Sequence, residues 1–335
     1  MTIKVITGGM QTTVQDLGRV GYQAQGVPVG GAMDRVAIRI ANLLVGNEES
    51  SGALEATIIG PALRFDTDTL IALSGADLEA TIEGVTIPLW HPVWAERGTT
   101  LRFGHAVDGC RTYIAIGGGV EVPPVFGSRS TYLRARFGGH EGRALKSGDV
   151  LHAGVPSTVS SRIAASLAGE GRRFVVGRWS ASPGLRPGYG RDVLLRVTPG
   201  AHHDALSDAG RETFATATFR VSSSSDRMGY RLEDAEIALS EPLEMLSEGT
   251  TFGTVQLPPG GAPIVLMADA QTTGGYPRVA EVITVDLPIV AQLKPGDRLR
   301  FRLVSVDEAQ AEYLDREGDL QQAKAAITHR FSRGS

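Results

Sequence analysis

The sequence predicts a mainly β protein with a few helices, built from two copies of one β-rich unit. Glycine is frequent, at 42 of 335 residues, and short β-branched or aromatic runs alternate with turn signals along the chain. The segment LKSGDVL at 145–151 returns as LKPGDRL at 293–299. Clear helical spacing is confined to a few segments. These observations favour an internal duplication over two unrelated domains.

The elements follow from local signals. Asp34 can cap the first turn of a helix and Gly46 can close the last one, so we expect a helix from Asp34 to Val45. Other segments with helical spacing are expected to form connectors and a tail. They lie near 160–167, 203–214 and 307–327. Short apolar runs that predict strands include 62–65, 69–73 and 111–116.

The repeated heptapeptide gives the domain plan. Each copy should form a turn that enters a strand, and each follows an apolar strand that runs into glycines, YIAIGGG at 113–119 and IVLMADAQTTGG at 264–275. The order of parts is therefore the same in both halves. We expect domains at 1–158 and 172–305, followed by a helical tail at 306–335.

Composition excludes several classes of function. Hydrophobic residues at 42% and charged residues at 21% are typical of a soluble globular protein. A formal charge of -4 does not favour nucleic acid as a partner. The single cysteine, Cys110, allows no intrachain disulfide, and no secretory leader or long apolar run is recognised, so we expect a cytoplasmic protein without a membrane partner. No metal-ligand spacing, GxSxG elbow or GxxxxGK[ST] loop is found.

The first polar cluster is TVQDLGRVGY at 13–22, followed by a glycine-rich stretch that ends at Asp34. Gln15, Asp16, Arg19 and Tyr22 supply donors and acceptors that could hold a small polar ligand. The alternative is a structural turn in which Asp16 and Arg19 pair with each other. For Asp34 the capping role is the favoured interpretation.

The second cluster is FGSRST at 126–131, after a Gly-Gly-Gly turn. Backbone amides, the Ser130 hydroxyl and the Arg129 guanidinium could recognise a carboxylate or a phosphate. A polar loop with Arg129 stacked on a neighbour has equal support.

The third cluster is SSSSDRMGYRL at 222–232, where Asp226 and Arg227 stand beside a glycine. It partly mirrors DLGRVGY at 16–22, so the two stretches could serve comparable pockets in the two halves. A solvated hairpin is the alternative.

The fourth cluster is ADAQTTGGYPR at 268–278. Adjacent polar residues between an apolar strand and a Gly-Gly turn are poor core residues, so a functional interpretation is favoured. Its candidate ligand-binding side chains are Gln271, Thr272, Thr273 and Tyr276.

Together these clusters and ALEATIIGPALRF at 53–65 resemble the allophanate hydrolase subunit 2 family, in order, from about Thr7 to Phe301. This biotin-dependent carboxyltransferase-like family includes the C subunit of 5-oxoprolinase, part of urea carboxylase and KipA-type proteins. The resemblance implies two tandem cyclophilin-like β-barrel domains. It also implies a complex that uses ATP to open 5-oxo-L-proline to L-glutamate.

The resemblance implies partners as well. One is a companion like allophanate hydrolase subunit 1, which is the B subunit of 5-oxoprolinase, and the other is its LamB/YcsF-like A subunit. No ATP site is recognised on this chain, so we expect the active centre to be completed by another chain. The alternatives are carboxyl transfer from biotin to urea or a related amide, and a regulatory protein that binds a kinase inhibitor.

Opening a lactam requires donors for the oxyanion and an acid or base near the ring nitrogen. As hypotheses we assign proton transfer to Asp226 or Asp16, assisted by Gln271. We assign the binding of an anionic group of the ligand to Arg227 or Arg129. The remaining expected substrate-binding residues are Gln15, Arg19, Tyr22, Ser130, Thr272, Thr273 and Tyr276.

Overall fold

The protein is described from a computed structural model over residues 1–169, 171–243 and 245–332. Its chain divides into two compact units. Unit 1 contains residues 1–18, 34–187 and 317 onwards, and unit 2 contains residues 19–33 and 188–316. Strands dominate both units, which confirms the mainly β prediction.

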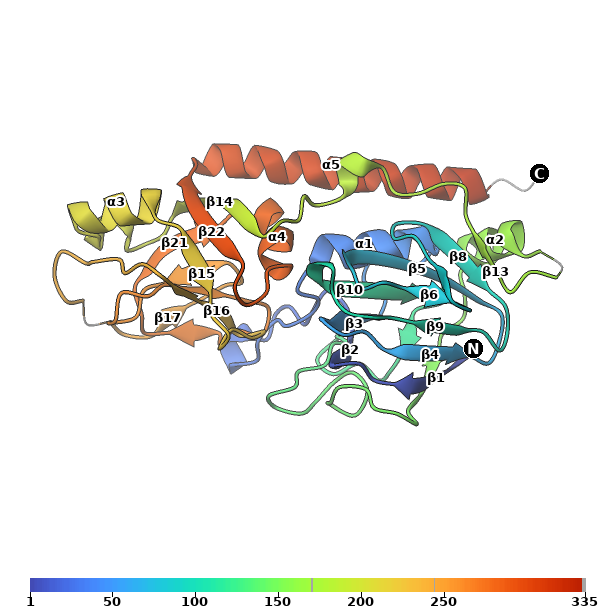
Figure 1. Cartoon of the computed structure of the whole chain (residues 1–335). Helices are drawn as coiled ribbons and strands as arrows, with labels where there is room; N and C mark the ends of the chain where they lie inside the picture. The colour runs from blue at the N-terminus through green and yellow to red at the C-terminus, as the bar shows by residue number, and fades with distance from the viewer. Residues whose placement is uncertain (170, 244, 333–335) are drawn as a thin grey trace. The chain divides into compact units, whose positions relative to one another are not determined.

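Unit 1 contains two sheets (Figure 1). The strand order of the first is β11-β12-β1-β4-β9-β6-β7, and that of the second is β13-β8-β5-β10-β3-β2. The described pairings within both sheets are antiparallel. The strands are β1 (Thr2–Thr7), β2 (Gln11–Gln15), β3 (Ala53–Thr57), β4 (Ala62–Phe65), β5 (Thr69–Asp77), β6 (Thr81–Ile82), β7 (Val85–Thr86), β8 (Pro92–Ala95), β9 (Thr100–Arg102), β10 (Asp108–Ile116), β11 (Val120–Glu121), β12 (Val150–Ala153) and β13 (Phe174–Val176).

The core of unit 1 lies between apolar faces of these sheets. Ile3 and Leu63 from the first sheet join Val14, Leu54 and Ile114 from the second in one buried cluster. The opposite face of the second sheet packs against helix α1 (Arg35–Leu44), which contacts β5 and β10 (Figure 1). That helix covers the polar face on which the site described below is built.

Unit 2 is a closed barrel with the strand order β14-β21-β18-β19-β16-β15-β22. The β14 and β22 strands pair in parallel, whereas the other described barrel pairs are antiparallel. A separate ladder joins β17 to β20. The strands are β14 (Asp192–Pro199), β15 (Phe219–Val221), β16 (Gly229–Glu233), β17 (Glu248–Gly249), β18 (Thr254–Gln256), β19 (Ile264–Leu266), β20 (Thr273–Gly274), β21 (Arg278–Val282) and β22 (Arg298–Leu303).

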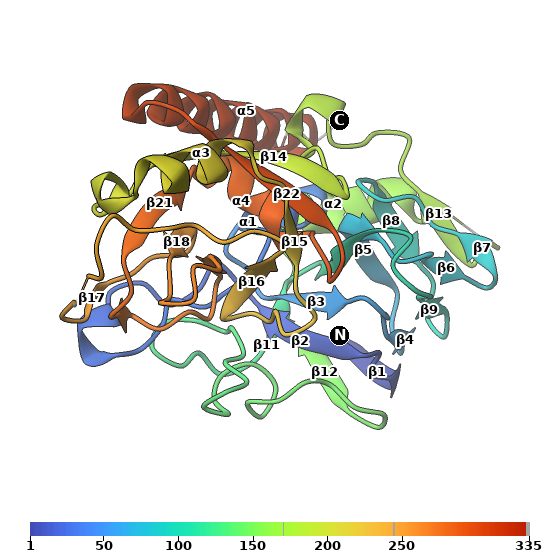
Figure 2. The ribbon, with the colours of Figure 1, turned by 60° about the vertical axis from the view of Figure 1, so that its left-hand side comes forward.

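The helices largely follow their sequence signals. Asp34 caps α1 by accepting a hydrogen bond from the Ala37 backbone N–H (2.8 Å), and Gly46 follows in the left-handed region. The helix expected at 203–214 is instead a short 3-10 turn followed by a helix, because extended Ser207 caps a new start. That second helix lies beside β22 (Figure 2). The other helices are α2 (Thr158–Leu167), α3 (Asp208–Thr216), α4 (Leu287–Ala291) and α5 (Val306–Ser332).

The two copies of the repeated heptapeptide form matching turns. Asp149 accepts a hydrogen bond from the Lys146 N–H (2.8 Å), and Asp297 accepts one from the Lys294 N–H (3.0 Å). The glycine before each aspartate has a φ near +90°, which strongly favours glycine. Each turn leads into a strand, β12 or β22, as the sequence predicts.

The predicted domain ranges 1–158, 172–305 and 306–335 remain a proposal. Residues 333–335 of the predicted tail lie outside the described residues. The described part of α5 contributes residues 306–316 to unit 2 and the rest to unit 1.

Candidate functional site

A row of polar side chains crosses the second sheet of unit 1, beneath α1. Thr13 of β2 pairs with Glu55 of β3, and Glu55 pairs with Tyr113 of β10. Because side chains alternate along a strand, this row faces away from the core that contains Val14 and Leu54. The row therefore places ionisable groups in a buried setting without disrupting the core.

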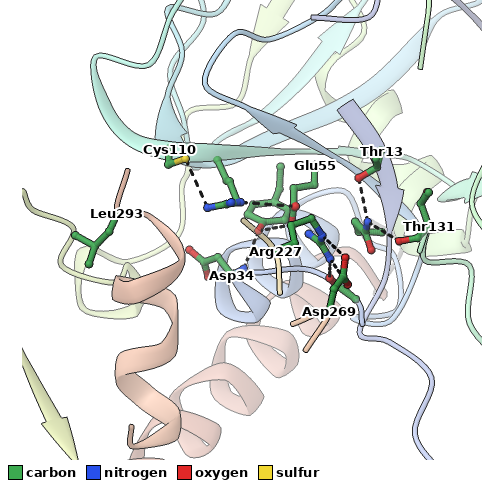
Figure 3. A network of polar contacts seen from close by, with 12 residues as sticks. Thr13, Asp34, Glu55, Cys110, Thr131, Arg227, Asp269 and Leu293 are labelled. Atoms are coloured by element: carbon green, nitrogen blue, oxygen red, sulfur yellow. Dashed lines mark hydrogen bonds and ion pairs between the residues drawn. The ribbon is translucent and has the colours of Figure 1, made fainter. Parts of the chain in front are cut away.

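Glu55, labelled in Figure 3, lies at the centre of this row and pairs with Tyr113. The Tyr113 hydroxyl donates to Glu55 Oε2 (2.7 Å) and accepts from the backbone N–H of Asp34 (2.7 Å). Arg111 Nε lies 3.9 Å from Glu55 Oε1. Burial, reinforced by the Glu55 carboxylate, raises the pKa of Tyr113 well above its usual range, so the phenol stays a neutral donor.

Asp16, at the end of β2, organises the loop that carries two of the expected binding residues. Its Oδ1 accepts hydrogen bonds from the hydroxyls of Ser128 (2.6 Å) and Ser130 (2.5 Å). Backbone N–H groups of Gly18 (2.8 Å) and Arg129 (2.6 Å) also donate to this carboxylate. Asp16 is 5% exposed, and this geometry matches a structural anchor for the loop.

Gln15 is fully buried beside this loop. Its Nε2 donates to Thr13 Oγ1 (3.0 Å) and to the Thr131 carbonyl (3.2 Å), as Figure 3 shows. Its Oε1 is buried and has no hydrogen-bond donor among the described residues. Since buried polar atoms are nearly always satisfied, this acceptor suits the N–H of a ligand or a water molecule.

In unit 2, Arg227 and Asp269 form a buried bidentate ion pair. The Arg227 Nε lies 2.8 Å from Asp269 Oδ2, and Nη2 lies 3.0 Å from Oδ1. Arg227 Nη2 also donates to the Gly31 carbonyl (2.6 Å). A Cβ on Gly30 would approach Arg19 Nη1 to 3.0 Å, at a φ of +61°. Segment 19–33 therefore packs closely on this pair, and Arg19 is buried with it.

The ADAQTTGGYPR segment places Gln271 beside buried Gln256 of β18. Gln271 Nε2 donates weakly to Gln256 Oε1 (3.4 Å), and the Gln271 carbonyl accepts from Thr250 Oγ1 (2.6 Å). The Thr272 carbonyl accepts from the Thr250 N–H, while exposed Thr273 pairs with Gly249 in the short ladder. These contacts hold the segment over the outside of the barrel.

A half-buried acid, Glu281, lies on β21, where it pairs with Thr254 of β18. Its Oε2 accepts from the hydroxyls of Thr254 (2.8 Å) and Thr251 (3.3 Å). Burial raises the pKa of Glu281, and these hydrogen bonds and Arg278 only partly oppose the rise. Arg278 itself pairs with Glu248 at 2.5 Å. A carboxyl group with a raised pKa holds its proton to a higher pH than an ordinary carboxyl group, which favours a role as proton donor.

Three of the expected residues lie on the surface of unit 2. Asp226 is exposed and accepts from the N–H groups of Met228 (2.7 Å) and Gly229 (3.3 Å), which closes the turn between β15 and β16. Tyr276 is 43% exposed and lines a hollow of about 1000 Å³. Tyr22 is 36% exposed beside a short 3-10 turn.

The expected site residues therefore fall into several places. Unit 1 brings together Gln15, Asp16, Arg129 and Ser130. In unit 2, Arg19 accompanies Arg227, and Gln271, Thr272 and Thr273 lie together on the barrel. Sequence reasoning missed polar residues within strands, namely Glu55, Arg111, Tyr113, Gln256 and Glu281. An ionisable residue inside an otherwise apolar strand, as in ALEAT, was the available signal.

Among the described residues, no group of three or more His, Cys, Asp or Glu side chains is placed to hold a metal ion. No described helix has the length and apolar character required to cross a membrane.

Most of the chain matches a known protein family. A family model described as carboxyltransferase domain, subdomain A and B, matches residues 25–303. The chain belongs to this family. The match confirms the family resemblance inferred from the motifs. The C subunit of 5-oxoprolinase from Escherichia coli strain K12 is 40% identical to the chain, over 92% of the chain and 93% of that protein.

The family also includes much longer relatives. The urea amidolyase of Saccharomyces cerevisiae is 32% identical over 92% of this chain, which spans only 17% of that protein. The crystal structure of urea amidolyase from K. lactis matches with a TM-score of 0.86 and 31% identity. That match covers 96% of this chain and 20% of the K. lactis chain.

Proposed function

We propose that this chain is the C subunit of an ATP-dependent 5-oxoprolinase, which opens 5-oxo-L-proline to L-glutamate. The observation that carries the proposal is the end-to-end similarity to the C subunit of the Escherichia coli 5-oxoprolinase, over 93% of that protein. The urea amidolyase similarity covers only 17% of the yeast protein, so that activity has less support for a chain of this length.

The chemistry proposed for the site follows from what a lactam requires. Its carbonyl is a poor electrophile, and activation of the oxygen with ATP would make attack by water feasible. Ring opening then needs an acceptor for the ring N–H and a proton for the leaving nitrogen. We assign the acceptor role to the unsatisfied Oε1 of Gln15 in unit 1. Within unit 2, Glu281, whose pKa is raised by burial, is a separate candidate for a proton donor.

The other expected residues receive narrower proposed roles. Asp16 is assigned to holding the Ser128–Ser130 loop, because its oxygens are already occupied by four donors. Arg129 in unit 1 or Arg227 in unit 2 is assigned to binding a substrate carboxylate or a phosphate. Gln271, Thr272 and Tyr276 supply hydrogen bonds, and Asp226 remains a candidate for proton transfer from the surface of the barrel.

The proposed complex contains two further proteins. They are a companion like allophanate hydrolase subunit 1 and a LamB/YcsF-like protein, with the cytoplasm as the proposed location. ATP is proposed to be used by the complex. Biotin would be required only if the chain acts in carboxyl transfer, the second candidate function below.

The test is reconstitution with both proposed partners and measurement of glutamate formed from 5-oxoproline, with and without ATP. We expect glutamate only with all three proteins and ATP. Gln15→Ala should lower turnover at least tenfold, a loss of about 1.4 kcal/mol in transition-state stabilisation. Gln23→Ala is the control, since Gln23 is exposed on a surface turn. Absence of glutamate from a stable, ATP-supplied complex would overturn the proposal and favour a regulatory role.

A second candidate is carboxyl transfer from biotin to urea or a related amide. The family description and the urea amidolyase relatives support it. A separate biotin carrier would be required. Incubation with a carboxylated carrier and urea tests it, and transfer at a catalytic rate would favour this candidate over lactam opening.

A further inference from the structure

Unit 1 contains a groove of about 640 Å³ that none of the expected site residues lines. One wall is α1, with Ile40, Leu43 and Leu44. A second wall is the segment that carries Trp179 and Leu185. The third wall is the C-terminal part of α5. The volume falls in the range of pockets that enclose small organic molecules.

The α5 wall is a single stripe of that helix. Its lining positions recur at three- and four-residue intervals, so they face the groove together. Ala323, Ala326 and Ile327 form the apolar middle, and Asp319 and Arg330 stand at the ends. Eleven residues of helix separate the two charges by roughly 16 Å. The groove is therefore long and apolar, with an acid at one end and a base at the other.

Polar contacts at both ends of the groove fix the position of α5 relative to the rest of unit 1. Arg39 of α1 forms a bidentate pair with Glu317, at 2.5 and 2.7 Å, at the start of this part of α5. Arg162 donates to the Phe331 carbonyl (3.0 Å) near its end. Between these anchors, alanines on α5 leave the apolar side chains of α1 without partners of matching size. The hollow is thus fixed by the fold.

The charged ends differ in what surrounds them. The Arg330 guanidinium lies 5.9 Å from the ring centre of Trp179 and 5.5 Å from that of Phe331. Neither Arg330 nor Asp319 forms an ion pair with another described residue. A guanidinium held over aromatic rings remains able to bind a carboxylate.

We propose that this groove binds a linear monocarboxylate with an apolar chain. The chain lies along Leu43, Ala326 and the Trp179 ring, and the carboxylate pairs with Arg330. Asp319 at the far end repels a second carboxylate, so a dicarboxylate of the same length binds more weakly. The proposal does not depend on the 5-oxoprolinase function.

The test uses sodium decanoate as the probe and the full chain as the protein. Trp179 is half-buried at the groove, whereas Trp90 and Trp94 are buried, so its fluorescence should report binding. We expect saturable binding by fluorescence and by calorimetry. Trp179→Phe should remove the fluorescence change but not the heat. Arg330→Gln should weaken binding about tenfold, the effect of losing one charge-assisted hydrogen bond.

Two adjacent exposed alanines on α5 provide a matched pair of variants. Ala326 lines the groove and Ala325 does not. Ala326→Trp should fill the groove and abolish decanoate binding, and Ala325→Trp should bind like the wild type. Circular dichroism of each variant checks that it is folded. Decanedioate should bind at least about tenfold more weakly than decanoate, since its second carboxylate meets Asp319.

Three results would overturn the proposal. One is absence of saturable decanoate binding by the wild-type chain. Another is equal binding by the two tryptophan variants, which would place the site elsewhere. The third is that the Ala326→Trp variant no longer binds the companion protein and that the wild-type chain does not bind decanoate. This result would assign the groove to a protein partner.

Discussion

Two aspartates with similar sequence surroundings have opposite environments. Asp16 in unit 1 and Asp226 in unit 2 each precede an arginine, a glycine and a tyrosine. Asp16 is 5% exposed and accepts four hydrogen bonds from a distant loop and from its own turn. Asp226 is exposed and accepts two hydrogen bonds, from the backbone N–H groups of Met228 and Gly229 in its own hairpin. One carboxylate fixes tertiary structure and the other closes a local turn.

The comparison shows that residue type alone does not assign a role. One of the buried acids of unit 2 is Asp269, which the fourth cluster contained but the expected site omitted. Both Asp16 and Asp269 hold chain segments far away in sequence, whereas Asp226 does not. A carboxylate whose acceptor positions are all occupied has less capacity for proton transfer than one that faces solvent.

The largest expected effect follows from removing Asp16. Asp16→Ala leaves two buried serine hydroxyls and two N–H groups without their acceptor, so we expect the free energy of unfolding to fall by about 4 kcal/mol. Urea unfolding followed by circular dichroism measures it. A variant as stable as the wild type but inactive would show that Asp16 acts in catalysis.

A slightly smaller effect is expected for Asp269. Asp269→Ala strands the buried Arg227 guanidinium, which should cost about 3 kcal/mol of stability. Asp286→Ala is the matched control, because Asp286 holds Arg196 in a similar bidentate pair, at 3.1 and 2.7 Å. Both variants should lose stability, but only Asp269→Ala should lose glutamate formation per folded molecule. If the Asp269→Ala and Asp286→Ala variants form glutamate at the same rate per folded molecule, the Arg227–Asp269 pair is not part of the active site.

Glu281 lies between the two extremes of exposure. Its pKa is raised in the folded state, so the native state binds this proton more tightly than the unfolded chain does. This contribution favours folding below the ordinary pKa of 4.5, and it is lost as the pH rises towards the raised folded value. Glu281→Gln should therefore be more stable than the wild type at pH 7, by less than about 1 kcal/mol, and equal to it at pH 4. Urea unfolding at both pH values measures the difference, and a pH-independent offset would contradict the assignment.

The smallest effect is expected for Asp226. Asp226→Ala removes two local hydrogen bonds from an exposed turn, so stability should fall by only about 0.5 kcal/mol. If glutamate formation in the reconstituted complex is also unchanged, Asp226 has no catalytic role. A loss of turnover without loss of stability would restore the sequence-based hypothesis.

Local signals predicted much of the fold. The cap at Asp34, the left-handed glycine at Gly46 and the two LKxGDxL turns involve contacts within a few residues, which a sequence displays directly. The 3-10 turn before Ser207 was not expected, because its interruption depends on the serine cap competing with helix continuation.

The site was harder to predict because its contacts are long-range. Gln15 reaches the Thr131 carbonyl, and Glu55 meets Tyr113 across neighbouring strands. Nothing in the sequence near Gln15 shows that its side-chain oxygen, Oε1, would remain without a hydrogen-bond donor among the described residues. The motifs pointed to segments rich in polar residues, but burial in the folded chain decides which side chains within them are accessible.

The division of the chain has a consequence for how it folds. Unit 2 requires residues 19–33, made early, and 188–316, made late, whereas unit 1 requires residues after 317. Neither unit can be completed on the ribosome until most of the chain has emerged. Pairing segments so distant in sequence slows folding and prolongs exposure of incomplete sheets. A fragment cut at residue 188 would thus separate each unit from part of itself, and we expect neither half to fold alone.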